Sequence, residues 1–210
     1  AWSLCGGSQL WQNGVRLLPE SQNPLSQEAA IRVCGVHKTY GGLVQRRKKA
    51  LNGVSLEVRR GEVFGLIGPN GAGKTTLMGC LLGLLRPEAG EIEVAGRPPD
   101  DLWVRERTGY LPERLGFDRG LTGWQFLDLH ARLAGVPVPQ AREAIEEGRR
   151  RCELAPDALG RRLKTYSRGM LQRIALAQAL FRDPEFLFLD EPTSGLDPTG
   201  VALVRRHIHD

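Results

Sequence analysis

Cysteine, aromatic residues and long apolar runs are all scarce in this 210-residue sequence. Aromatic residues make up 6% of it, and no uncharged stretch is both long and apolar enough to cross a bilayer. The cysteines, which form no CxxC pair, are Cys5, Cys34, Cys80 and Cys152. Their spacing argues against a disulfide framework and against a zinc site. We therefore expect a soluble protein of a reducing compartment, whose 41% of hydrophobic residues can bury one sizeable core and a smaller lobe.

Positively charged residues are only slightly in excess over negatively charged ones. The 29 lysines and arginines outnumber the 24 aspartates and glutamates, which gives a formal net charge of +5. The densest basic stretches, residues 46–49 and 149–151, are of a kind that can face nucleic acid or anionic lipid. A solvated loop and a solvated helix end are the preferred interpretation, because most charge runs face water. No nucleic-acid partner is expected.

The N-terminal stretch, residues 1–29, is polar and shows no sustained periodicity. It lacks the basic and apolar regions of a signal peptide, so we predict a leader or linker. Because the chain starts with Ala1 instead of methionine and ends abruptly at Asp210, we expect a fragment cut at both ends.

Alternating patterns begin after this stretch. Val54, Leu56 and Val58 alternate with polar residues, as do Ile92 and Val94. Period-two alternation is typical of half-buried strands, so these segments predict an antiparallel β layer.

Two other runs, VFGLI (63–67) and EFLFL (185–189), are almost continuously apolar. Strands buried on both faces have this composition, so both runs are predicted to be parallel core strands. Between them, Thr122 and Gln125 have capping-box spacing, and the stretch QAREAIEEGRRRCEL has apolar residues at helical intervals. The sequence thus predicts an α/β core with a helical lobe at about residues 115–165.

A glycine-rich stretch, GPNGAGKTT, follows the first apolar run directly and precedes an apolar helical pattern. This is the strand-loop-helix setting of the GxxxxGK[ST] pattern, whose backbone N–H groups surround a polyphosphate. Lys74 would reach the β- and γ-phosphates, and Thr75 would place its hydroxyl on Mg²⁺. An ordinary glycine turn is the alternative, but it requires neither side chain. The predicted nucleotide-binding residues are Gly68, Pro69, Asn70, Gly71, Ala72, Gly73, Lys74, Thr75 and Thr76.

Two carboxylates end the second apolar run, in FLFLDE. Asp190 is placed to bind Mg²⁺, and Glu191 is placed to orient or deprotonate an attacking water. A plain strand end is the alternative, which the phosphate loop upstream makes weak.

The order of these motifs, with YSRGM (166–170) a short way before the carboxylates, resembles the nucleotide-binding domain of ATP-binding cassette (ABC) proteins over about residues 31–200. In this resemblance, Gly68 to Thr76 match Walker A, Asp190 and Glu191 the end of Walker B, and Ser194 to Asp197 the D-loop. The implied fold is a P-loop NTPase core with an antiparallel β subdomain and an inserted α-helical subdomain, in one domain at 30–210.

YSRGM occupies the place of the family's LSGGQ signature. Ser167 and Gly169 match it, whereas Tyr166, Arg168 and Met170 do not. A serine hydroxyl and free N–H groups at a helix N-terminus still form an anion site. The resemblance implies that this site grips the γ-phosphate of ATP bound to the opposite subunit, in a homo- or heterodimer. Arg168 either strengthens that clamp or faces solvent.

Two further residues take their roles from the resemblance. Tyr40 sits where the family has an aromatic residue stacked on adenine; a core or turn tyrosine is the alternative. Glu113 replaces the usual Q-loop glutamine, and its carboxylate can approach Mg²⁺ and take part in catalysis.

The GYLPER and YSRGM variants resemble ATPases of ABC-2-type exporters, which implies a membrane permease as partner and a place on the cytoplasmic face of the membrane. The lobe would then dock this permease through apolar residues, unless all of these belong to its own core. They are Trp124, Phe126, Leu127 and Leu133.

The family's switch histidine should lie beyond the chain end. His207 and His209 follow Glu191 too closely to take that role. We therefore expect the chain to be a weak ATPase. Two alternatives stay open: a soluble ABC ATPase of translation or DNA repair, and a regulatory nucleotide-binding module without turnover. The lack of sustained heptads between residues 86 and 165 argues against the repair ATPases.

Overall fold

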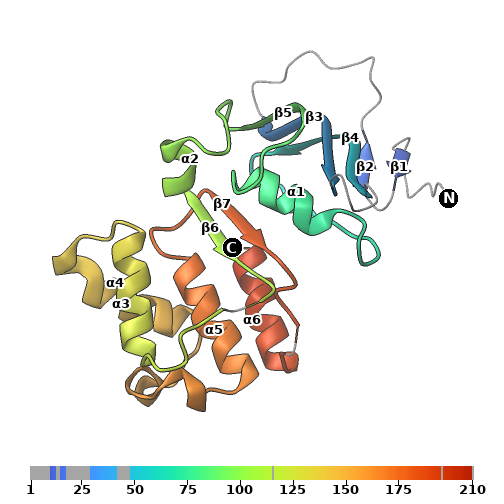
Figure 1. Cartoon of the computed structure of the whole chain (residues 1–210). Helices are drawn as coiled ribbons and strands as arrows, with labels where there is room; N and C mark the ends of the chain where they lie inside the picture. Colours follow the sequence, from blue (N-terminus) through green and yellow to red (C-terminus); the bar gives the residue numbers. More distant parts are fainter. Residues whose placement is uncertain are drawn as a thin grey trace. The chain divides into compact units, whose positions relative to one another are not determined.

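The computed structural model describes residues 10–12, 15–17, 29–41, 48–114, 116–194 and 196–209. The chain divides into two compact units, Ala1–Arg105 and Glu106–Asp210, which Figure 1 colours from blue to green and from green to red.

Strands dominate the first unit. Its elements are β1 (Leu10–Gln12), β2 (Val15–Leu17), β3 (Ala29–Tyr40), β4 (Lys48–Arg59), α1 (Lys74–Leu81), β5 (Ala89–Val94) and α2 (Leu102–Glu106), the last of which ends one residue into the second unit. Strands β1 and β2 form an antiparallel hairpin within the predicted leader. The second sheet has the order β4-β3-β5, and α1 packs beside β4 and β5 (Figure 1).

The predicted antiparallel β layer is confirmed. Both neighbours of β3 run antiparallel to it, so that Val33 lies opposite Leu56 on one side and Ile92 on the other. All three side chains are buried. Cross-strand apolar pairs of this kind hold a half-buried sheet together and fix its register.

The prediction of a buried strand at residues 63–67 is wrong. The segment has no strand conformation, and Val63 and Ile67 are 62% and 77% exposed. A strand exists only as part of a sheet, and no strand in the described ranges is hydrogen-bonded to this segment. An apolar composition alone therefore does not produce the strand.

Helices dominate the second unit. Its elements are β6 (Thr108–Leu111), α3 (Gly123–Leu133), α4 (Val138–Arg151), the 3₁₀ turns η1 (Pro156–Gly160) and η2 (Leu163–Thr165), α5 (Arg168–Ala179), β7 (Phe186–Leu189) and α6 (Pro198–His209). The predicted parallel strand at 185–189 is confirmed as β7, which pairs with β6 in parallel. The three helices α3, α4 and α5 pack against one another (Figure 1).

The predicted helix start at Thr122 is also confirmed. Its hydroxyl accepts a hydrogen bond from the Gln125 N–H at 3.2 Å, and the Gln125 side chain accepts one from the Thr122 N–H at 2.9 Å. These two bonds form the capping box that the spacing predicts.

Most of the apolar residues proposed for docking belong to the core of the lobe. Phe126 and Leu127 are 3% and 0% exposed, and Trp124 is partly buried against the same core. Leu133 alone of the four is open to solvent, at 73% exposure. A docking role for Phe126 and Leu127 is therefore wrong, because packing of α3 against α4 and α5 uses their side chains.

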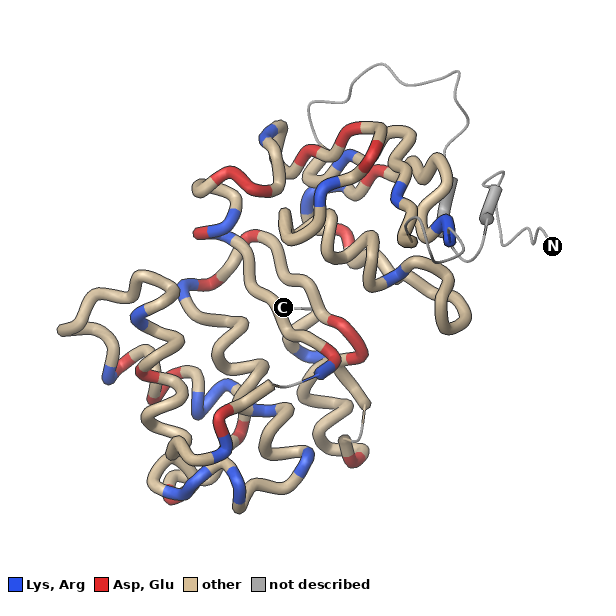
Figure 2. Tube along the Cα trace, in the orientation of Figure 1, with Lys and Arg blue, Asp and Glu red and all other residues tan. Residues whose placement is uncertain are grey.

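The basic run at the end of α4 is paired with acidic side chains. Arg149 and Arg150 bond to glutamates one turn earlier, and Arg151 bonds to Asp183 at 2.5 Å. Figure 2 shows basic and acidic residues interspersed along this lobe. The run thus lies at a helix end, as preferred from the sequence, but its arginines are paired with acidic side chains and are not merely solvated. In the other basic run, Arg46 and Arg47 lie outside the described residues.

None of the helices described is long and apolar enough to span a bilayer.

Candidate functional site

The glycine-rich loop leads directly into α1. Gly73 precedes the helix with a φ of 95°, and Gly71 has a φ of 81°. A side chain at Gly73 would also collide with the Ala50 carbonyl oxygen. Only glycine adopts this backbone conformation in so little space, so the sequence pattern has a steric cause at this position.

Lys74 folds back over its own loop. Its Nζ donates hydrogen bonds to the carbonyl oxygens of Gly68 at 2.6 Å and Pro69 at 3.2 Å. The Thr75 side chain beside it is exposed. No side chain caps the start of α1, and its first turn contains no acidic residue. The positive end of the helix, one ammonium group and one hydroxyl are thus available to an anion, and the loop fits a polyphosphate.

Tyr40 lies at the end of β3. Its side chain is 44% exposed, so it is not a core tyrosine. An exposed ring at a strand end is compatible with the predicted stacking on a base.

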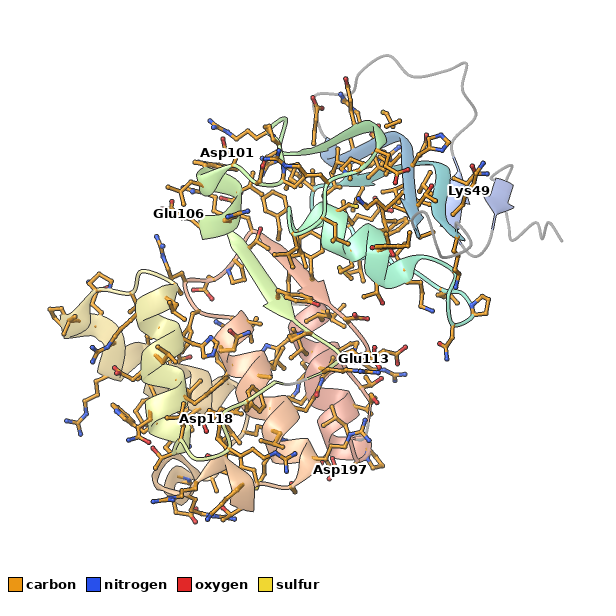
Figure 3. All side chains as sticks on the ribbon, viewed as in Figure 1. Lys49, Asp101, Glu106, Glu113, Asp118 and Asp197 are labelled. Carbon is orange, nitrogen blue, oxygen red and sulfur yellow. The ribbon has the colours of Figure 1, made fainter. Side chains whose placement is uncertain are left out.

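The predicted acidic residues of the second unit lie at one edge of the β6–β7 pair. The two strands are parallel, so their carboxyl ends point the same way, and the Asp190 N–H donates to the Leu111 carbonyl oxygen at 2.9 Å. Glu113 follows β6 by two residues and is exposed (Figure 3). Burial, together with the negative charges of Asp190 and Glu113, raises the pKa of Tyr110. Both carboxylates are therefore near enough to Tyr110 to act on its pKa.

Glu191 has an unusual backbone conformation. Its φ is 50°, in the left-handed region, and its carbonyl oxygen accepts a hydrogen bond from the Ser194 N–H at 3.0 Å. Holding a residue other than glycine there costs about 1–3 kcal/mol, and such residues cluster at active sites. The side chain is exposed.

Ser167 is the N-cap of α5, as the sequence predicted for the head of this helix. Its Oγ accepts a hydrogen bond from the Met170 N–H at 3.2 Å. The side chain is exposed, and Gly169 is partly buried. Arg168 does not simply face solvent, because its guanidinium donates to the Ser194 hydroxyl at 2.8 Å. The signature segment is thereby joined to the turn after the carboxylates.

Two glutamines of α5 form links that sequence reasoning missed. The Gln172 amide donates to the Pro192 carbonyl oxygen at 3.1 Å, and the Gln178 amide donates to the Tyr110 carbonyl oxygen at 2.8 Å. Gln172 is 4% exposed. The available signal was an amide at Gln172 within an otherwise apolar face of the helix, since a buried polar side chain requires a partner.

The family model described as ABC transporter matches residues 51–194. The chain belongs to the ABC transporter family. It is 47% identical to an uncharacterized ABC transporter ATP-binding protein of Nostoc, over 86% of this chain and 55% of that protein. It is 46% identical to a daunorubicin resistance ATP-binding protein of Streptomyces coeruleorubidus, over 84% and 55%. The chain thus spans about half the length of these curated relatives.

A solved structure shows the same fold. It is a dimeric ATP-binding cassette in a post-hydrolysis state bound to ADP and Pi, with a TM-score of 0.76 and 24% identity. The match covers 84% of this chain and 80% of that one. The predicted fold class, a P-loop NTPase core with an antiparallel β subdomain and an inserted α-helical subdomain, is confirmed.

The segment that resembles a D-loop ends at Asp197, which forms a turn with the residues after it. Asp197, just before α6, accepts hydrogen bonds from the Gly200 N–H at 2.8 Å and the Thr199 hydroxyl at 3.0 Å (Figure 3). These bonds lower the pKa of Asp197, because they stabilise its charged form. The aspartate thereby stabilises the start of the helix that follows the ABC motifs.

His207 contacts the main chain at the end of α4. Its Nε2 lies 2.9 Å from the Arg151 carbonyl oxygen at the end of α4. This contact ties His207 to the main chain of α4. The His209 side chain lies outside the described residues.

Proposed function

We propose that residues 30–210 form the nucleotide-binding domain of an ABC transporter, which binds and hydrolyses ATP, and that residues 1–29 are a leader or linker. The observation that carries this proposal is the phosphate loop. Among the described residues, Lys74 bonds only to main-chain carbonyl groups. It lies at the N-terminus of α1, which no side chain caps, and the chain belongs to the ABC transporter family.

Each site residue has a distinct task in this proposal. Lys74 and the N–H groups of the loop bind the β- and γ-phosphates of ATP, and Tyr40 stacks on the adenine. Thr75 in the first unit and Asp190 and Glu113 in the second would serve as ligands of Mg²⁺, which would neutralise charge on the phosphates.

Glu191 orients the attacking water and accepts its proton. The strained backbone at Glu191 and its place directly after Asp190 support this role.

The proposal further includes a dimer, homo- or heteromeric, that closes on two ATP molecules. Ser167 and Gly169 of each subunit would then bind the γ-phosphate held by the other. A membrane permease is the proposed partner, which places the domain on the cytoplasmic face of the membrane. The names of the relatives favour a transporter over a translation or repair ATPase, and the drug-resistance relative favours an exporter.

Calorimetry of MgATP binding tests the phosphate loop. Lys74→Ala should weaken binding sharply, because it removes the ammonium group of the loop. Lys49→Ala, which removes an exposed lysine outside the loop, serves as the control (Figure 3). Equal affinities of Lys74→Ala and the parent chain would show that the loop does not bind the phosphates.

The rate of ATP hydrolysis tests the proposed role of Glu191 as general base. In the full-length protein, Glu191→Gln should retain bound ATP and slow its hydrolysis by about 10²–10⁴-fold, the usual contribution of a general base. Phosphate release under saturating ATP measures this effect. An unchanged rate would assign the base to another residue.

A further inference from the structure

A second lysine lies against the phosphate loop. Lys48 begins β4, and in the β3–β4 register it lies directly opposite Tyr40. A methyl group placed on Gly71, in the middle of the loop, would lie 3.3 Å from the Lys48 Nζ. The Walker A pattern does not include this lysine, which precedes the loop by twenty residues.

No acidic side chain among the described residues pairs with Lys48. Within the described part of the chain, neither Lys48 nor Lys74 forms an ion pair. The sequence contains no aspartate or glutamate from residue 63 to residue 87, a stretch that includes the whole loop and α1. Two ammonium groups and the positive end of a helix thus meet at one loop, and within the described residues neither ammonium group is paired with a carboxylate. This arrangement favours a polyanion.

We propose that Lys48 is a second polyphosphate-binding lysine of this domain. This inference rests on the proposed binding of ATP at the loop. In this proposal, the end of β3 and the start of β4 contact the same nucleotide. The ring of Tyr40 contacts the base, and the ammonium group of Lys48 contacts the β- or γ-phosphate. The expected ligands are nucleoside di- and triphosphates, because a monophosphate does not extend to the loop's centre.

The test compares ATP with AMP. Each nucleotide competes with a fluorescent ATP analogue for the parent chain and for Lys48→Gln, Lys48→Arg, Lys49→Gln and Lys74→Ala. Lys48→Gln should weaken ATP binding about three- to tenfold, the range of a charge-assisted contact at an exposed site, and leave AMP binding unchanged. Lys48→Arg should retain most of the ATP affinity, and raised salt should narrow the difference between Lys48→Gln and the parent.

Lys49→Gln is the matched control, since it removes the same charge from the neighbouring residue. Its effect should stay below about twofold, because long-range charge effects at the surface are screened. If Lys48→Gln behaves like Lys49→Gln while Lys74→Ala still weakens ATP binding, Lys48 is not a phosphate ligand and the proposed function stands. Normal ATP binding by Lys74→Ala would overturn the proposed function itself. Equal losses for ATP and AMP in Lys48→Gln would also overturn the inference, because they would indicate damage to the base site.

Discussion

Ser167 combines a structural contact with a proposed functional one, and one substitution separates them. Its Oγ caps α5 by accepting the Met170 N–H, and Thr122 caps α3 in the same way through Gln125. Removing either hydroxyl should therefore lower the free energy of unfolding by about 1 kcal/mol, the usual loss for a Ser or Thr cap changed to Ala. Thr122→Ala is thus a control for the stability effect of Ser167→Ala.

Only Ser167→Ala should also weaken the ATP-bound dimer. A hydrogen bond to a charged phosphate contributes about 1.5 kcal/mol or more, and a homodimer would lose two of them. The sum is about 3 kcal/mol, or roughly a hundredfold in the dimer dissociation constant. Binding of ATP to the separate subunit should change little, because Ser167 would act on the nucleotide of its partner.

Sedimentation with saturating MgATP measures the dimer in a full-length Glu191→Gln background, which keeps ATP intact. Urea denaturation of each variant measures the stability loss. Equal dimerisation of the Ser167→Ala and Thr122→Ala variants would refute the role of Ser167 at the phosphate. A stability loss in Thr122→Ala alone would refute the cap at Ser167.

Two further predictions concern stability. Tyr166→Phe should lower the free energy of unfolding by about 1–2 kcal/mol in urea denaturation, because it leaves the buried Ala158 carbonyl oxygen without the hydroxyl that donates to it at 2.6 Å; an unchanged midpoint would mean that water replaces this donor. Asp197→Asn should destabilise the chain near neutral pH, and its difference from the parent should shrink as the pH falls below about 4, because a carboxylate with a lowered pKa stabilises the fold only while it is ionised. Urea midpoints at about pH 7 and about pH 3 test this, and a difference that is the same at both would contradict it.

Local signals were predicted well because neighbouring residues determine them. The capping box at Thr122 and the cap at Ser167 each depend on hydrogen bonds over three residues. The alternation in β4 and β5 likewise indicated strands with one buried face. Gly71 and Gly73 follow the same rule, since both have a positive φ that other residues rarely adopt.

Features that depend on distant partners were missed. The four-residue strand β6 is stabilised by β7, far away in the sequence, and its own residues give no clear signal. The apolar segment 63–67 has the composition of a strand but no strand partner in the described ranges. Phe126 has an apolar side chain that suits a docking surface as well as a core, and only the packing of α3 distinguishes the two.

The attachments of α5 have a mechanical consequence. Its 12 residues form a rod of about 18 Å, with Ser167 at one end. Gln172 near its middle bonds to Pro192, which follows β7, and Gln178 near its far end bonds to Tyr110 within β6. Because a closely packed core deforms little, a displacement of Ser167 should move α5 as a rigid body. The two segments bonded to the helix should move with it. If Ser167 binds the phosphate held by the other subunit, as proposed, that contact would be linked through α5 to the segments that carry Asp190 and Glu191.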